Sequence, residues 1–323
     1  MLLRYAARRL LMAVPLLLGI SVLTFLLIHL AGNPVQQQMV MNPKFSAASA
    51  AALRHLYGLD EPLPLQYWHW LSRMARLDFG LSLHDQRPVL DKIAEALPAT
   101  LLLNGMALSL VLAVGIPFGV HSATHPRTRF TRLFGGFSFV AYSFPVFWLA
   151  LLVQLSMAVA LGWLPISGYT SPGMESSTGL SRVGDVLWHS AAPLLVSVLG
   201  DWALLSRYVR NSMFEVLGQD FIRTARAKGL GERAVFWRHA LPNALLPVIT
   251  VLGLSLPGLI SGSVIIESIF AWPGLGRLAW DASMGYDGPV VMGLVVIGAL
   301  MTILGNLAAD LAIAALDPRI KVA

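Results

Sequence analysis

Three acidic residues stand within or beside apolar sequence, where a charged side chain is costly. Asp201 lies inside one apolar run, Glu267 directly follows another, and Asp310 lies near the end of a third. A carboxylate at the centre of a bilayer costs about 2.5–3.5 kcal/mol on insertion scales, unless it faces protein or water. We therefore expect Asp201 to line a central cavity or to pair with a residue of a neighbouring subunit. Glu267 is expected to be a gate or a cap near the external surface, and Asp310 to pair with Arg319 or with a basic loop.

Histidines are the next candidates, because imidazole binds metal ions. His121 and His125 are four residues apart, which places both rings on one face of a helix. No third ligand is evident beside them, so we interpret them as interfacial side chains and leave any metal site unassigned. His29 ends the first apolar run, on the side where a cation or chelate would arrive. We group it with Asp201 and Glu267 as candidate residues of a pathway across the membrane.

Patterns typical of enzymes are absent from the sequence. No GxxxxGK phosphate-binding loop occurs, so the chain does not hydrolyse ATP by that mechanism. The run Gly274–Ala279 fits GxGxxA, but it follows Trp272 and Pro273 in a short connection and not a strand, so we interpret it as a turn. The serines lack a pairing with His and Asp in chain context. We predict a non-catalytic chain that binds no cofactor itself and, without cysteines, has no thiolate metal site.

Membrane helices must position these residues. Of the 323 residues, 56% are hydrophobic and only 12% charged, and the mean hydropathy is +0.68, whereas soluble domains carry about 25% charged residues. Six apolar runs approach the roughly 20 residues that a helix needs to cross a bilayer, and a helix satisfies its own backbone groups in lipid. The predicted transmembrane helices cover residues 10–30, 100–121, 138–161, 188–206, 241–266 and 289–311.

The first apolar run has a signal peptide as its alternative interpretation. It is longer than the roughly 7–15 apolar residues of a signal peptide, and His29-Leu30-Ala31 is a poor cleavage site. We therefore expect an uncleaved helix. The polar, nearly neutral segment 32–97 follows, with helices expected over 47–57 and 66–77, and we predict that it is an extracytoplasmic insertion.

Basic residues indicate the orientation. Most lysines and arginines fall in the tails and connections that this order of helices assigns to the cytoplasm, whereas the short external connections hold only Arg182 and Arg277. Short loops carry the topological signal, so both termini are predicted to be cytoplasmic. The net charge of +6 is then explained mostly by basic residues that set the membrane topology, and we expect no nucleic-acid partner.

The cytoplasmic stretch between the fourth and fifth spans has a pattern of its own. Asp220 is suited to cap the N-terminus of a short helix over 221–228. Gly229 is suited to the left-handed residue that closes it. A second helical run over 232–241 is expected to end at Pro242. The stretch therefore predicts two short helices joined by glycines at the membrane surface.

This stretch resembles the coupling signature of binding-protein-dependent ABC importer permeases: EAA, three residues, G, nine residues and I-x-LP. Four residues are in register, namely Ala225, Gly229, Leu241 and Pro242. Three depart from it, namely Arg223, Thr224 and His239. The runs TARAKGL and RHALPNALLPVIT are nevertheless similar to the dipeptide/oligopeptide/nickel branch, where such departures are the norm. YGLDEPLPLQY, LDFGLS, LPATL, ESIFAWPGLGR and DPRIK extend the resemblance over nearly the whole chain.

Within this branch the chain most resembles nickel permease B subunits. The runs QRPVLDKIAEALPATL, GWLPISGY, IIESIFAWPGLGR and AALDPRIK carry that likeness, and the connection 166–187 is shorter than peptide permeases of the branch commonly have. We therefore expect import of nickel or a nickel–metallophore complex, with a di- or oligopeptide importer as the alternative. A secondary ion-coupled carrier is a remote alternative, because it would need no ATPase-docking helices and would usually show inverted repeats. A channel would need a polar pore lining, which these spans lack.

The resemblance implies an all-α membrane protein with six transmembrane helices in the type I ABC importer permease fold. Its partners would be a homologous second permease subunit, two cytoplasmic ABC ATPase subunits that bind ATP and Mg²⁺, an extracytoplasmic substrate-binding protein and membrane lipid, in the bacterial inner membrane. The residues implied in ATPase coupling are Asp220, Arg223, Thr224, Ala225, Lys228, Gly229, Leu241 and Pro242. The expected organisation is an N-terminal helix (1–31), the insertion (32–97), a permease core (98–312) with a coupling loop (207–240), and a tail (313–323).

Overall fold

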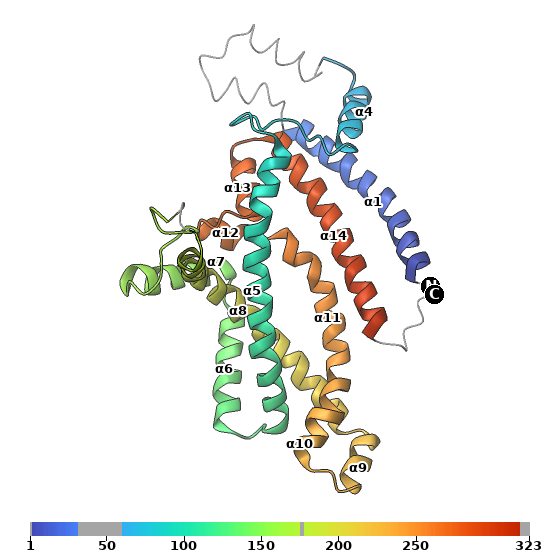
Figure 1. Cartoon of the computed structure of the whole chain (residues 1–323), viewed down its shortest axis with the longest axis vertical. Coiled ribbons are helices and arrows are strands. Elements are labelled where there is room, and N and C mark those ends of the chain that lie inside the picture. Colours follow the sequence, from blue (N-terminus) through green and yellow to red (C-terminus); the bar gives the residue numbers. More distant parts are fainter. Residues whose placement is uncertain (1, 32–59, 175–177, 317–323) are drawn as a thin grey trace.

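The computed structural model describes residues 2–31, 60–174 and 178–316, and these form an elongated bundle of helices (Figure 1). Within them the only strand-like feature is an isolated bridge between Leu81 and Pro88. The elements are α1 (Leu2–Ala31), α4 (Leu63–Met74), α5 (Val89–Thr124), α6 (Arg129–Ser143), α7 (Val146–Val153), the π-helix η1 (Gln154–Ala160), α8 (Leu180–Leu217), α9 (Asp220–Ala227), α10 (Glu232–Ala234), the π-helix η2 (Val235–Ala240), α11 (Leu241–Ser261), α12 (Val264–Ile269), α13 (Leu275–Met284) and α14 (Gly288–Leu316). The all-α class is confirmed, and the predicted helix over 47–57 lies outside the described residues.

Four described helices are long and apolar enough to cross a membrane: α1, α5, α8 and α14. The helices α6 and α7–η1 would make a fifth crossing if taken together. The 21-residue α11 occupies the place of the predicted span 241–266 and lies between α5 and α14 in Figure 1. That span ends at Ser261, because Gly262 takes a φ of 71° and turns the chain into α12.

The predicted third span is wrong in one respect. The sequence predicts one helix over 138–161, whereas α6 and α7–η1 meet at an angle of 107°. Pro145 has no N–H to donate and disfavours a helical conformation in the residue before it. Phe144 is accordingly extended, with φ −82° and ψ 137°, and α7 begins after Pro145.

The fourth span is longer than predicted. It was expected over 188–206, but α8 continues to Leu217, so the connection predicted to be the coupling loop begins at Gly218 and not at residue 207. Its arginines do not interrupt the helix, because arginine is a good helix former and its side chain can lie on aromatic rings. The Arg207 guanidinium lies 5.9 Å from the ring centres of Phe139 and Tyr142.

The helices α5 and α8 pack closely along much of their length. A Cβ atom on Gly119 would lie 2.6 Å from the Val209 Cβ, and one on Gly115 would lie 2.9 Å from a methyl group of Leu205. Small residues let two helix backbones approach in this way. Ser206 adds a hydrogen bond across the pair, from its Oγ to the Gly115 carbonyl at 3.2 Å. This pair is the rigid support of the site described below.

The helix α1 lies along α14 at the edge of the bundle (Figure 1). Arg9 of α1 forms an ion pair with Asp310 of α14 at 3.0 Å. The expected partners of Asp310 were Arg319, which lies outside the described residues, or the basic loop. The pairing with Arg9 replaces that prediction, because α1 and α14 pack against each other and bring these two charges together.

Candidate functional site

A groove of about 520 Å³ runs between α5, α8 and α11, and Asp201 lies on its wall. Residues of α8 at helical spacing form one side: Ser197, Gly200, Asp201, Leu204, Leu205 and Tyr208. Residues of α5, including Asn104 and Val111, and residues 258–266 form the others. Asp201 lies 21 residues after the start of α8 and 16 before its end, which is about 30 and 24 Å along the axis. The groove therefore passes the middle of the longest helix.

The Asp201 carboxylate is exposed to this groove in the single chain. Within the described residues it has no hydrogen bond or ion pair, and the same holds for the Tyr208 hydroxyl. Other polar groups of the lining are satisfied inside the chain. Asn104 Nδ2 donates to the Leu259 carbonyl at 2.7 Å, and Ser197 Oγ donates to the Pro193 carbonyl at 2.8 Å. Asp201 is thus the charge of the groove that is open to a partner from outside this chain.

Glu267, the second pathway candidate, is fully buried and does not line the groove. Its carboxylate accepts hydrogen bonds from the backbone N–H groups of Gly276 (2.7 Å), Arg277 (3.1 Å) and Ser263 (3.3 Å), and from Thr100 Oγ1 (3.1 Å). Gly276 and Arg277 lie in the first turn of α13, so Glu267 caps that helix and neutralises its positive end. Of the two expected roles, the geometry is that of a cap.

We call the surroundings of Glu267 the Glu267 junction: Ala99 and Thr100 of α5, and Glu267, Trp272, Gly274 and Gly276. Trp272 is buried, and its Nε1 donates to the Ala99 carbonyl at 2.9 Å. The Leu275 N–H donates to Thr100 Oγ1 at 2.7 Å. Any Cβ on Gly274 would lie 2.4 Å from a Glu267 oxygen, so this position requires glycine. The Gly274–Ala279 run is therefore the start of α13, packed on a carboxylate.

His29, the third pathway candidate, does not line the groove and lies on the side of α1 that faces α4. Its ring nitrogens are 3.0 Å from the Phe25 carbonyl and 3.0 Å from the Gln66 side-chain oxygen. Asp201, Glu267 and His29 are thus at three separate places, and of these only Asp201 lines the groove. His121 and His125 stack with ring centres 4.8 Å apart. The described residues hold no group of three or more His, Cys, Asp or Glu arranged for a metal ion.

Residues 218–240, with α9, α10 and η2, form the end of the bundle opposite α4 and α13 (Figure 1). Gly229 has a φ of 79°, which confirms the predicted left-handed turn after α9. The predicted cap is wrong: Gln219 is the extended residue before α9, and Asp220 is already helical. The Asp220 side chain is 95% exposed and pairs with Arg223 at 3.4 Å. Its charge still suits the first turn of a helix, without capping it.

One face of α9 is anchored in the bundle. Ile222 and Ala225 are buried in a cluster with Met213 of α8 and Val235 of η2. Arg226 closes the turn by donating two hydrogen bonds to Glu232, at 2.8 and 3.2 Å. The outer face is exposed and carries Phe221, Arg223, Thr224, Lys228 and Leu230. The stretch therefore presents a mixed apolar and basic surface on a fixed support.

The second helix of the stretch does not end at Pro242, contrary to the prediction. The helix runs from α10 through η2 into α11, which begins at Leu241 with Pro242 in its first turn. A first turn tolerates the missing proline N–H, and the wider π-helical turn before it absorbs the change in hydrogen bonding. Ser212 Oγ of α8 also donates to the Ala244 carbonyl of α11 at 2.7 Å. The surface around α9 is thus continuous with α11, which lines the groove.

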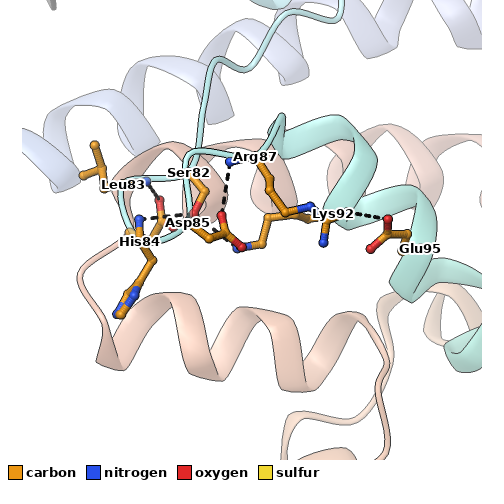
Figure 2. A network of polar contacts seen from close by, with 8 residues as sticks. Ser82, Leu83, His84, Asp85, Arg87, Lys92 and Glu95 are labelled. Atoms are coloured by element: carbon orange, nitrogen blue, oxygen red, sulfur yellow. Dashed lines mark hydrogen bonds and ion pairs between the residues drawn. The ribbon is translucent and has the colours of Figure 1, made fainter.

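A polar network at the α13 end was not predicted (Figure 2). Asp287 is buried and accepts from Ser82 Oγ at 2.5 Å and from the Leu83 N–H at 3.1 Å. Lys92 Nζ donates to Asp85 at 2.9 Å and to Ser82 Oγ at 3.2 Å, and its hydrogen bond lowers the Asp85 pKa to about 2. The network holds the segment before α5 against the turn between α13 and α14. Because Ser82 and Asp287 are 205 residues apart, no local pattern signals their contact.

Known proteins are similar to this chain in sequence and in fold. The family described as binding-protein-dependent transport system inner membrane component matches residues 115–322, and the corresponding N-terminal family matches residues 2–104. The oligopeptide transport system permease protein AppB of Bacillus subtilis is 42% identical over 319 residues, covering 98% of this chain and 99% of that protein. The dipeptide transport system permease protein DppB of Escherichia coli K12 is 37% identical, covering 99% of each.

The glutathione transport system permease protein GsiC of Salmonella typhimurium is 35% identical, again covering 99% of both chains. Among solved structures, the inward-facing MetNI methionine ABC transporter matches with a TM-score of 0.55. That match has 19% identity and covers 70% of this chain and 96% of the other, so it supports the fold alone.

Proposed function

The chain belongs to the family of binding-protein-dependent transport system inner membrane components, in its dipeptide and oligopeptide branch, and from this we propose that it is the permease subunit of an ATP-driven importer of short peptides. The observation that supports a peptide substrate is the full-length similarity to proteins named for oligopeptides, dipeptides and glutathione. The comparisons favour this alternative over the nickel or nickel–metallophore substrate expected from the short motifs.

The short connection 166–187 does not argue against peptides. AppB, named for oligopeptides, aligns over 319 residues that make up 98% of this chain and 99% of its own. The two proteins are therefore nearly equal in length, which leaves little room for a longer insertion in the relative. Connection length then gives no reason to prefer nickel.

Two ATPase subunits would bind ATP and Mg²⁺ and move against the exposed face of α9, which carries Arg223, Thr224 and Lys228. Burial of Ile222 and Ala225 and the helix that continues through η2 into α11 favour transmission as a rigid body. A second permease subunit would close the open side of the groove, and a binding protein would deliver the peptide at the α13 end. This chain would be non-catalytic, since ATP hydrolysis belongs to the partner subunits.

The same proposal fixes the orientation and the organisation of the chain. Basic residues concentrate around α9 and at the start of α1, which favours a cytoplasmic α9 and cytoplasmic termini by the positive-inside rule. The location would be the bacterial inner membrane. Residues 98–312 would form the permease core, and residues 32–97 an extracytoplasmic insertion.

Reconstitution of the complete complex in proteoliposomes tests the proposal. The complex holds this chain, the second permease subunit, the ATPase subunits and the binding protein. We expect uptake of a radiolabelled dipeptide that requires ATP, and no comparable uptake of nickel ions. ATP-dependent nickel uptake without peptide uptake would overturn the substrate. Peptide uptake that continues without the ATPases and follows an ion gradient would overturn the importer class in favour of a secondary carrier.

A further inference from the structure

The wall that α8 contributes to the groove presents polar groups in one stripe. Ser197, Asp201 and Tyr208 lie at positions i, i+4 and i+11, which a helix with 3.6 residues per turn places along one face. Leu204 lies between them on the same face. Along this stripe the Asp201 carboxylate is followed by the Tyr208 phenol about 10 Å further along the helix axis.

The polar groups of this stripe differ in whether their hydrogen-bonding capacity is already used within the chain. The Ser197 hydroxyl proton is used within α8, whereas the Asp201 carboxylate and the Tyr208 hydroxyl have no partner among the described residues. An ionised carboxylate in an apolar environment is stable only with a compensating charge or hydrogen-bond donors. Asp201 is therefore poised for a cation that brings its own N–H donors.

The groove around Asp201 has room for such a group. A Cβ built on Gly200 or on Gly258 would meet no atom within 4 Å, so neither glycine is packed against the rest of the chain. The volume of about 520 Å³ lies within the roughly 300–1,000 Å³ of small-molecule sites. An extended dipeptide is about 7 Å long, shorter than the separation of Asp201 and Tyr208 along the helix.

We propose that Asp201 is the specificity-determining residue of the groove and binds the amino-terminal ammonium group of the peptide during passage. This inference rests on the proposed function. The ammonium group is a monovalent cation with three N–H donors, the complement of a lone carboxylate. The competing occupant is a lysine or arginine of the second permease subunit, which would pair with Asp201 permanently.

Uptake by the reconstituted complex tests the role of the charge. The probes are alanyl-alanine and lactoyl-alanine, in which a hydroxyl replaces the terminal amine, each at a concentration that saturates the binding protein. We expect Asp201→Asn to lower alanyl-alanine uptake about tenfold or more, the size of a lost charged hydrogen bond, and to leave lactoyl-alanine uptake unchanged. Asp201→Glu keeps the charge and is expected to keep most of the uptake. Asp310→Asn is the matched control, a carboxylate of α14 that pairs with Arg9 and does not line the groove, and it is expected to match wild type.

Carbodiimide coupling supplies a readout that does not depend on uptake of the analogue. The reagent joins a carboxylate to an amine in direct contact with it, so turnover with alanyl-alanine should attach the dipeptide to Asp201, as read by mass spectrometry. Lactoyl-alanine should give no adduct. A covalent link between Asp201 and a lysine of the second permease subunit, or an unmodified Asp201, would overturn the inference. If Asp201→Asn took up alanyl-alanine at the wild-type rate, the inference about Asp201 would also be overturned, while the proposed function would stand. No peptide uptake by wild type would instead refute the proposed function.

Discussion

Ile222→Ala tests whether α9 transmits motion because it is docked on the bundle. Ile222 is fully buried, in contact with the cluster formed by α8, η2 and α11. Truncation of a buried isoleucine to alanine costs about 2–5 kcal/mol. Because every 1.4 kcal/mol is a factor of about ten, the ratio of docked to undocked α9 should fall by roughly 30-fold to several thousand-fold. The outer face of α9, which would contact the ATPase, keeps its chemistry.

The assay is the ratio of peptide uptake to ATP hydrolysis by the reconstituted complex in the presence of loaded binding protein. We expect this ratio to fall at least severalfold, because a loosened α9 absorbs the displacement that a docked α9 passes to η2 and α11. Ile93→Ala is the matched control: it truncates an equally buried isoleucine of α5, 2% exposed, near the opposite end of the bundle. It should lower thermal stability and leave the ratio unchanged. An unchanged ratio for Ile222→Ala, or an equal fall for both variants, would refute transmission through a docked α9.

Three further outcomes follow from the packing and the charges. Gly258→Leu adds its side chain where a Cβ meets no atom within 4 Å; it should narrow the groove and reduce peptide uptake at least tenfold with normal expression. Gly19→Leu on α1, where a Cβ also meets no atom, should leave uptake unchanged, and equal uptake by both would exclude the groove as the pathway. Glu267→Ala should destabilise the chain by about 2–6 kcal/mol, because two buried donors, the Gly276 N–H and the Thr100 hydroxyl, lose their acceptor at about 1–3 kcal/mol each, and Glu267→Gln by less; thermal unfolding checks both, and an unchanged midpoint for Glu267→Ala would contradict the cap. The Asp85 pKa is lowered to about 2, so its pair with Lys92 should stabilise the segment before α5 above about pH 4 and lose that effect as the pH falls towards 2; the hydrogen-exchange protection factors of residues 78–88, taken relative to the intrinsic rate at each pH, should fall over this window in wild type and not in Asp85→Asn.

The sequence predicts well those features that depend on neighbouring residues alone, such as the membrane helices and the turn at Gly229. Apolar runs locate the membrane helices, since burial of the backbone in lipid admits few other structures. Gly229 marks the left-handed turn after α9, as predicted. Helix ends are predicted less well, because hydropathy falls where charges begin, while α8 runs on through Arg207 and Arg210 to Leu217. The sequence predicts one span over 138–161 despite Pro145, and the 107° bend depends on how α7 then packs on α8 and α12.

Long-range contacts are what the sequence does not reveal. Asp287 follows α13 and holds Ser82 across 205 residues, and neither residue belongs to a recognisable pattern. Glu267 was identified by its cost in an apolar setting, yet the four donors that satisfy it come from three separate segments. The same argument of cost singled out Asp201, whose carboxylate lies on the groove without a partner among the described residues. A costly charge thus indicates that something must compensate it, and the fold decides whether that is the chain itself or another molecule.

The Glu267 junction explains why the short motifs do not identify the substrate. ALPATL supplies the Ala99 carbonyl and Thr100 Oγ1, and ESIFAWPGLGR supplies Glu267, the Trp272 indole and the crowded glycine Gly274. GWLPISGY joins the same region, since the Gly168 N–H donates to the Phe270 carbonyl at 2.8 Å. These motifs are specific because they satisfy one buried carboxylate and one helix end, a requirement that does not depend on what the protein carries. Under the inference above, substrate selection would belong to residues outside them, such as the stripe of α8 around Asp201, which only the fold brings onto the groove.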